Sequence, residues 1–129
     1  MSSPLEVEHV DFVSVPVSDV ERSIAFYRDT LELPQTNKGA WPEFKLGDNV
    51  FLYLVEPTRF GVEKWEPHTA QIALRVPDVA AAKEALEAKG VEFGAEIFDT
   101  GVCHMAFFTD PDGNALMLHH RYAPRTPQG

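Results

Sequence analysis

The side chains of this chain that are best suited to chemistry are its histidines and its cysteine. The sequence contains His9, His68, His104, His119, His120 and a single cysteine, Cys103. Imidazole acts as a general base near neutral pH and binds borderline metal ions. One cysteine excludes an intramolecular disulfide and a zinc site made of several thiolates. The histidines are therefore the first candidates for catalytic or metal-binding residues.

The histidines near the C-terminus lie in two segments, 102–109 and 115–120, that predict strands joined by a tight turn. If the strands pair without a bulge, His104 lies opposite His120, with Cβ atoms about 4.5–5.5 Å apart. The two rings could then share a metal or a proton, or form a partly exposed contact on the side of the helices or solvent. His119 faces the other side of the sheet in this register. A bulge at the turn would exchange the faces of one strand, so both registers stay open.

The first half of the chain predicts one strand, one helix and a hairpin. Residues 10–17 alternate and are rich in valine, which is typical of a strand. Ser18 or Asp19 suits a helix N-cap, and the helix that follows ends before a proline. Strands are expected at 41–46 and 50–55, around a Gly-Asp-Asn turn. The apolar face of the helix is formed by Val20, Ile24, Tyr27 and Leu31.

The second half repeats this order after a connector without clear periodicity. Residues 69–76 predict a strand, Asp78 opens a helix rich in alanine, and Gly90 closes it. The motif Val17-Ser18-Asp19-Val20 corresponds to Val76-Pro77-Asp78-Val79, since each joins the end of a strand to the start of a helix. The remaining strands of the second half are expected at 91–98, 102–109 and 115–120.

This repetition predicts the fold class. One unit alone would be a small sheet with one helix and an uncovered apolar face, whereas two units side by side can curl around a cavity. We predict an α+β fold in which two tandem βαβββ modules form a cup-shaped mixed sheet with the helices outside. Residues 1–129 fit a single domain. Its expected parts are module 1 at about 9–56, a connector at 57–68, module 2 at 69–120 and a tail at 121–129.

The net charge of −9 limits the partners that this chain can bind. A nucleic-acid partner requires a basic footprint, which such a chain lacks, whereas a cationic small ligand would be attracted. No apolar run approaches the length of about 20 residues that a membrane helix requires. The N-terminus also lacks the basic and apolar regions of a signal peptide. We therefore expect a cytoplasmic protein that binds neither nucleic acid nor membrane.

Three motifs, in this order and at these spacings, carry a resemblance to a known family. They are the stretch from Val17 to Tyr27, Val76-Pro77-Asp78-Val79 and Asp110-Pro111-Asp112-Gly113-Asn114. Together they resemble the vicinal oxygen chelate superfamily, which includes glyoxalase I, fosfomycin- and bleomycin-resistance proteins and extradiol dioxygenases. The resemblance implies the paired βαβββ architecture and a homodimer. The last motif also suits a tight turn, so its expected role is structural.

In enzymatic members, the resemblance implies a divalent metal held by His, Glu or Gln from the first and last strands of each unit. The first-strand positions, counted back from the helix-capping acids, are Phe12 and Gln71. The last-strand positions are Met117 and Tyr53, or Leu52 if the register differs by one residue. Phenylalanine has no donor atom, methionine is a soft thioether, and tyrosine is a rare ligand. We therefore predict no metal cofactor, with a divalent metal at an atypical site as the alternative.

Without metal ligands, the predicted pocket has mostly apolar and aromatic walls, which is the profile of a small-molecule site. Its walls are Phe12, Phe51, Tyr53, Met105, Phe107 and Met117, and its polar groups are Ser14, Gln71, Arg75 and His119. Aromatic walls in an acidic chain suit an aromatic or cationic ligand. Much of this set could equally be plain core. His119 is the candidate acid or base if a reaction takes place.

Two functions from different classes are consistent with these observations. The first is a metal-independent small-molecule-binding protein that resembles the bleomycin-resistance branch. The second is a lyase, isomerase or dioxygenase-like enzyme that uses an atypical metal site or His119. Because the usual metal-ligand positions are replaced, the sequence leaves open whether the chain is an enzyme.

Overall fold

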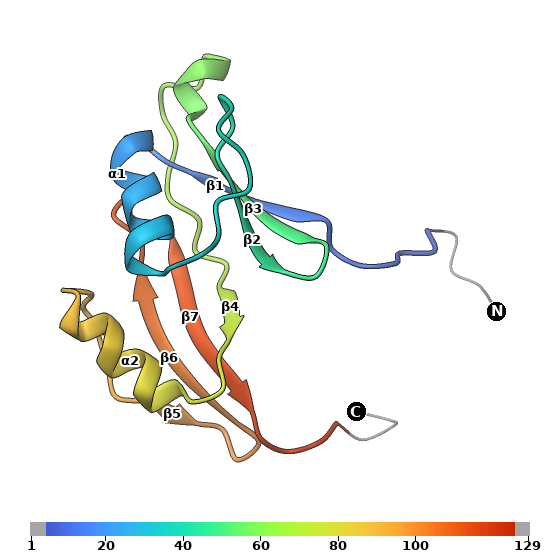
Figure 1. Ribbon diagram of the computed structural model, residues 1–129, viewed down its shortest axis with the longest axis vertical. Coiled ribbons are helices and arrows are strands. Elements are labelled where there is room, and N and C mark those ends of the chain that lie inside the picture. The colour runs from blue at the N-terminus through green and yellow to red at the C-terminus, as the bar shows by residue number, and fades with distance from the viewer. Residues whose placement is uncertain (1–4, 126–129) are drawn as a thin grey trace. The chain divides into compact units, whose positions relative to one another are not determined.

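The computed structural model describes residues 5–125, which form two units divided between Glu66 and Pro67 (Figure 1). The elements of unit 1 are β1 (Phe12–Pro16), α1 (Val20–Ile24), the π-helix η1 (Ala25–Thr30), β2 (Glu43–Gly47), β3 (Val50–Val55) and the 3-10 helix η2 (Pro57–Phe60). The elements of unit 2 are β4 (Ile72–Arg75), α2 (Val79–Ala88), β5 (Phe98–Asp99), β6 (Cys103–Thr109) and β7 (Ala115–Arg121). Each unit builds its own sheet.

The sheet of unit 1 has the strand order β1-β3-β2. β1 runs parallel to β3, and β2 pairs with β3 antiparallel across the turn that the sequence predicts. Because side chains alternate between the faces of a strand, Val15, Phe44 and Leu52 gather on one face, where they are fully buried. Tyr27 from the helical segment joins them, with its ring 5.9 Å from that of Phe44. The core of unit 1 therefore lies between this face and the helix.

Of the two N-cap candidates, Asp19 caps the first helix, since its carboxylate accepts a hydrogen bond from the Arg22 backbone N–H at 3.1 Å. The α-helix gives way to the π-helix η1, and the Leu31 N–H donates to the carbonyl oxygen of Phe26. The predicted helix is therefore present, but its second part is a π-helix. The wider π turn includes the buried Tyr27, and an apolar periodicity does not distinguish the two kinds of turn.

The sheet of unit 2 has the strand order β4-β7-β6-β5. β4 is parallel to β7, and β6 and β7 form an antiparallel hairpin. α2 is capped by Asp78, whose carboxylate accepts a hydrogen bond from the Ala81 N–H at 3.0 Å, and it packs against β6 and β7 (Figure 1). The strand residues that form the core of unit 2 are Ala106, Phe108, Leu116 and Leu118.

The turn between β6 and β7 has the structural role that its sequence predicts. Asn114 is fully buried, and Asp110 is nearly so. The Asn114 Nδ2 donates to the Asp110 carboxylate at 2.8 Å, and the Asn114 Oδ1 accepts from the His68 backbone N–H at 2.9 Å. Gly113 adopts a φ of 92°, which glycine tolerates without strain. This network fixes the ends of both strands and so the register of the hairpin.

One predicted strand is largely absent. The sequence predicts a strand at 91–98, but the strand β5 is limited to Phe98–Asp99 at the end of that segment. Gly94 interrupts the segment, and β5 pairs only with the start of β6. In unit 1, an isolated bridge between Gln35 and Phe44 stands where a complete βαβββ order would have another strand. The strand propensity of a segment does not show whether a neighbouring strand is available to pair with it.

The two mixed sheets, each with a helix, confirm the α+β class and the doubled unit. The closure of both sheets into one cup stays a prediction, as does the assignment of all 129 residues to a single domain. The predicted tail begins at the last residue of β7, and its residues 126–129 lie outside the described part of the chain.

Candidate functional site

In each unit, one face of the sheet carries the core, and the opposite face carries most of the exposed side chains of the strands. We call these opposite faces the open face of unit 1 and the open face of unit 2. On the open face of unit 1 lie Phe12, Ser14, Glu43, Lys45, Phe51 and Tyr53. On the open face of unit 2 lie Gln71, Ala73, Arg75, Met105, Phe107, Met117 and His119. The predicted pocket residues therefore form two sets, one on each sheet.

The pairing of β6 with β7 is the register that the sequence predicts in the absence of a bulge. His104 lies opposite His120, and Met105 lies opposite His119. The pairing is uninterrupted from the turn to the end of β7. The alternative register, in which the faces of one strand are exchanged, is therefore excluded.

The structure also decides which residue of β3 corresponds to Met117. Ser14 is the parallel neighbour of Tyr53 in unit 1, and Ala73 is the parallel neighbour of Met117 in unit 2. Leu52, the alternative, is fully buried in the core of unit 1. Tyr53 therefore occupies the last-strand position on the open face of unit 1.

The open face of unit 1 combines two aromatic rings with a carboxylate. Phe12 is 54% exposed and meets Tyr53 edge to face, with ring centroids 5.0 Å apart and an interplanar angle of 77°. Glu43 lies directly opposite Tyr53, and its carboxylate accepts hydrogen bonds from the Tyr53 and Thr36 hydroxyls. Glu43 was missed from the sequence. The alternation along β2 places it on the face opposite Phe44, but its position opposite Tyr53 depends on the register of β2 against β3.

The open face of unit 2 is apolar at its centre and polar along its edge. Met117 is 9% exposed and is flanked on the neighbouring strand by Phe107, which is 36% exposed. Arg75 is exposed on the edge strand β4, and Gln71 is exposed one residue before that strand begins. Apolar walls with a few polar groups at the edge can hold and orient an organic molecule.

His119, the candidate acid or base, is half-buried on the open face of unit 2. Arg75 is its neighbour on β4, and Met105 lies opposite it on β6. Within residues 5–125, its ring forms no hydrogen bond or ion pair with a carboxylate. A catalytic histidine usually receives its orientation from such a partner. The ring is thus partly exposed on this face, and no carboxylate among the described residues orients it.

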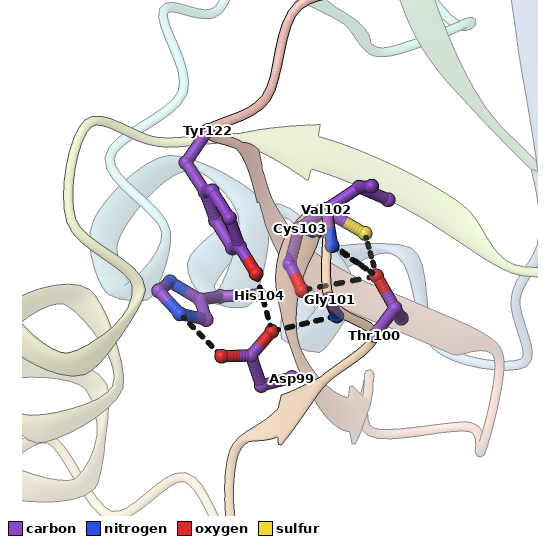
Figure 2. Close-up of polar contacts among 7 residues, drawn as sticks. All are labelled: Asp99, Thr100, Gly101, Val102, Cys103, His104 and Tyr122. Atoms are coloured by element: carbon purple, nitrogen blue, oxygen red, sulfur yellow. Dashed lines mark hydrogen bonds and ion pairs between the residues drawn. The ribbon is translucent and has the colours of Figure 1, made fainter.

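His104 and His120 have separate partners. The Nε2 of His104 lies 3.3 Å from the Asp99 carboxylate, and its ring lies 4.9 Å from that of Tyr122 (Figure 2). The Nδ1 of His120 lies 2.9 Å from the carbonyl oxygen of Val76. These contacts support the interpretation of the pair as a cross-strand contact away from the open face.

Asp99 is the centre of the polar cluster in Figure 2. Its carboxylate accepts hydrogen bonds from the Gly101 backbone N–H and the Tyr122 hydroxyl, both at 2.8 Å. The Gly101 N–H lowers the pKa of Asp99 most, followed by the Tyr122 hydroxyl and then the nearby His104. The hydrogen bond to Asp99 raises the pKa of Tyr122. This exposed cluster ties the residue after β7 to β5.

Unit 2 also contains a cleft of about 740 Å³ beside the end of α2. From the predicted pocket, only Gln71 and Phe107 line it. The rest of its lining comes from Glu87, the segment 91–94 and residues next to the β6–β7 turn. The cleft therefore meets the open face of unit 2 at one end and does not coincide with the predicted pocket.

The four positions at which the resemblance implies a metal do not suit one. Phe12 has no donor atom, Met117 offers a soft sulfur, and the Tyr53 hydroxyl donates to Glu43. Gln71 is the one member of the four with an amide oxygen. Across the described residues, no three His, Cys, Asp or Glu side chains gather into a group that could hold a metal ion. The residues present at these positions therefore do not fit the implied metal.

The family of this chain follows from a comparison with known proteins. The sequence model of the Glyoxalase/Bleomycin resistance protein/Dioxygenase superfamily matches residues 8–118. The chain belongs to this superfamily. Membership accounts for the doubled unit and for the order of the three motifs. Among residues 5–125, no helix is long and apolar enough to cross a membrane.

Relatives in the superfamily include a named enzyme and a named binding protein. Lactoylglutathione lyase of Haemophilus influenzae is 37% identical over 109 residues, which cover 75% of this chain and 81% of that protein. TnmS3, an antibiotic binding protein from Streptomyces sp. CB03234, is 30% identical, with a TM-score of 0.74 over 89% of this chain and 97% of TnmS3. A glyoxalase/bleomycin resistance protein from the same Streptomyces strain is 28% identical, with a TM-score of 0.70 over 87% of this chain and all of that one.

Proposed function

We propose that this protein is a small-molecule-binding member of the superfamily that works without a catalytic metal. The observation that carries the proposal is the chemistry at the four implied metal positions. Aromatic and apolar side chains, among them Phe12, Tyr53 and Met117, stand there on open sheet faces. Such groups bind organic surfaces but do not hold a divalent cation. The similarity to TnmS3, an antibiotic binding protein, supports the same function.

The ligand that fits these faces is an organic molecule with aromatic or cationic character. The rings of Phe12 and Tyr53 offer surfaces for stacking and for contact with a cation. The net charge of −9 raises the local concentration of cations around the chain. We further propose that the protein acts in the cytoplasm as a homodimer.

A thermal-shift screen against aromatic compounds tests the proposal. A ligand at a hundredfold excess over its Kd should add about 2.7 kcal/mol to the free energy of unfolding, which raises the melting temperature. Phe12→Ala should remove the shift, because it deletes an exposed ring of the open face of unit 1. The matched control is Phe60→Ala, which deletes an exposed ring of η2 that stacks on Trp41 rather than on Phe12 or Tyr53. The absence of any shift across the aromatic set would count against a binding function.

A second candidate function is a lyase, isomerase or dioxygenase-like enzyme. Two observations favour it: the 37% identity to lactoylglutathione lyase and the position of His119 on the open face of unit 2 beside Arg75. In this alternative, the chain uses an atypical metal site, or His119 moves a proton to or from the substrate.

Turnover of a dicarbonyl or a catechol distinguishes the enzyme from the binding protein. The enzyme should lose its activity in His119→Asn and keep it in His9→Asn, which changes an exposed histidine that pairs with Asp11. The binding protein shows no turnover in either variant or in the unmodified chain. Turnover that depends on His119 would establish the second function in place of the first.

A further inference from the structure

We propose that Glu43, held in place by Tyr53, selects a positively charged ligand group: on the open face of unit 1, its carboxylate binds a protonated amine carried by an aromatic ligand. This inference rests on the proposed binding function and names the chemistry of one contact within it. The feature behind it is the meeting of a carboxylate, a phenol and an exposed phenyl ring on one sheet face.

The carboxylate of Glu43 is oriented before any ligand arrives. Glu43 is half-buried at the start of β2, directly opposite Tyr53. Its Oε2 accepts from the Tyr53 hydroxyl, and its Oε1 accepts from the Thr36 hydroxyl. An ionised carboxylate has about four acceptor sites, so both oxygens keep capacity for a further donor. A preorganised acceptor binds its partner at a lower entropic cost.

The charge of Glu43 has no cationic partner in the part of the chain that the structure describes. Its hydrogen-bond donors are neutral hydroxyls, and it takes part in no ion pair. Lys45 shares the same face two residues further along β2, but its side chain is exposed and forms no ion pair with Glu43. A half-buried carboxylate with neutral partners favours an added positive charge over a neutral group.

The aromatic rings beside Glu43 favour the same class of ligand. The ring of Phe12 meets Tyr53 edge to face and is 54% exposed, so one of its sides is open to a ligand. A protonated amine next to a carboxylate and an aromatic ring gains a charge-assisted hydrogen bond and a cation–π contact. A neutral aromatic molecule gains stacking alone, and an anionic one is repelled by Glu43.

Three probes that share a naphthyl ring test this contact. Naphthylmethylamine is cationic, naphthylmethanol is neutral and naphthoate is anionic at pH 7. In NMR titrations of the unmodified protein, the amine should bind at least about tenfold more tightly than the alcohol, with the naphthoate weakest. In Glu43→Gln the preference for the amine should disappear, while the alcohol keeps its affinity. The unchanged affinity for the alcohol also shows that the variant is folded.

Two further variants separate the contact from the overall charge. Glu84→Gln removes one negative charge from the exposed side of α2, so it should preserve the preference for the amine. Tyr53→Phe keeps the ring but removes the hydroxyl that holds the carboxylate, so the preference should fall. If the amine and the alcohol bind equally, or if Glu43→Gln keeps the preference, this inference is overturned and the binding function stands. If none of the three probes binds, both are overturned.

Discussion

Leu52 and Tyr53 are neighbours in β3, yet the first is fully buried in the core and the second lies on the open face of unit 1. Leu52→Ala should lower the free energy of unfolding by about 3 kcal/mol, because it leaves a cavity in packed core. Phe12→Ala should cost only about 1 kcal/mol, the value of its edge-to-face contact with Tyr53. Urea unfolding measures both changes. Equal losses in the two variants would contradict the assignment of the faces.

A second test at the scale of single residues concerns the pH dependence of Asp99. Its pKa is lowered in the folded protein, chiefly by the Gly101 N–H. The ionised Asp99 therefore stabilises the folded protein at pH values above the pKa of Asp99 in the unfolded chain. This stabilisation is lost as the pH falls through the lower pKa of Asp99 in the folded protein. In Tyr122→Phe, the pKa of Asp99 should rise but stay below its ordinary value, because the Gly101 bond remains.

An NMR titration of the Asp99 carboxyl carbon measures this change. The matched control is Tyr53→Phe, which removes a hydroxyl in the other unit and should leave the titration of Asp99 unaltered. A midpoint that is the same with and without the Tyr122 hydroxyl would show that this hydrogen bond does not act on Asp99.

The alternation of side chains along the strands predicted which residues share a face, but it did not identify Glu43 as a site residue. Phe12, Ser14 and Tyr53 could be assigned from the repeat, because the two halves fix equivalent positions. Glu43 lies in a predicted strand and carries an obvious charge. Its relevance depends on its position opposite Tyr53, and the register of β2 against β3 cannot be read from residue types alone.

At the scale of elements, the β6–β7 turn is the feature that fixes unit 2. Asn114→Ala should destabilise the protein by about 3 kcal/mol, because it removes the side-chain oxygen that accepts from the His68 N–H and the buried side-chain amide that donates to the Oδ2 of Asp110. The control Glu84→Ala changes an exposed residue of α2 and should stay within about 0.5 kcal/mol of the unmodified protein. Urea unfolding midpoints compare the two. A loss below about 1 kcal/mol in Asn114→Ala would mean that the turn is not needed for stability.

The same turn explains which elements the sequence predicts well. The hairpin register followed from the turn residues 110–114, whose hydrogen bonds are local. The strand expected at 91–98 required a neighbouring strand to pair with, and only β5, at the end of this segment, pairs with one. The π-helix η1 differs from an α-helix by the spacing of its hydrogen bonds, which residue types do not encode. The tight turn and the helix caps were predictable from residue types, whereas the length of β5 and the kind of helical turn in η1 were not.

At the scale of the whole molecule, the net charge of −9 should make the binding of cations sensitive to salt. A rise in ionic strength from about 0.02 M to 0.5 M should weaken the binding of naphthylmethylamine several-fold, because ions screen exposed charges. The neutral naphthylmethanol should bind equally well in both solutions. Equal salt dependence of the two probes would show that charge does not contribute to recognition.

The superfamily includes relatives named for an enzyme and for antibiotic binding, and we propose that this chain binds its ligand without a metal. The most direct test is the affinity for an aromatic ligand, measured by calorimetry before and after EDTA treatment, on protein purified without chelators and analysed for metal. We predict no stoichiometric metal and the same affinity in both samples. Stoichiometric Ni, Zn, Mn or Fe, together with loss of binding after EDTA treatment, would contradict a metal-independent binding protein.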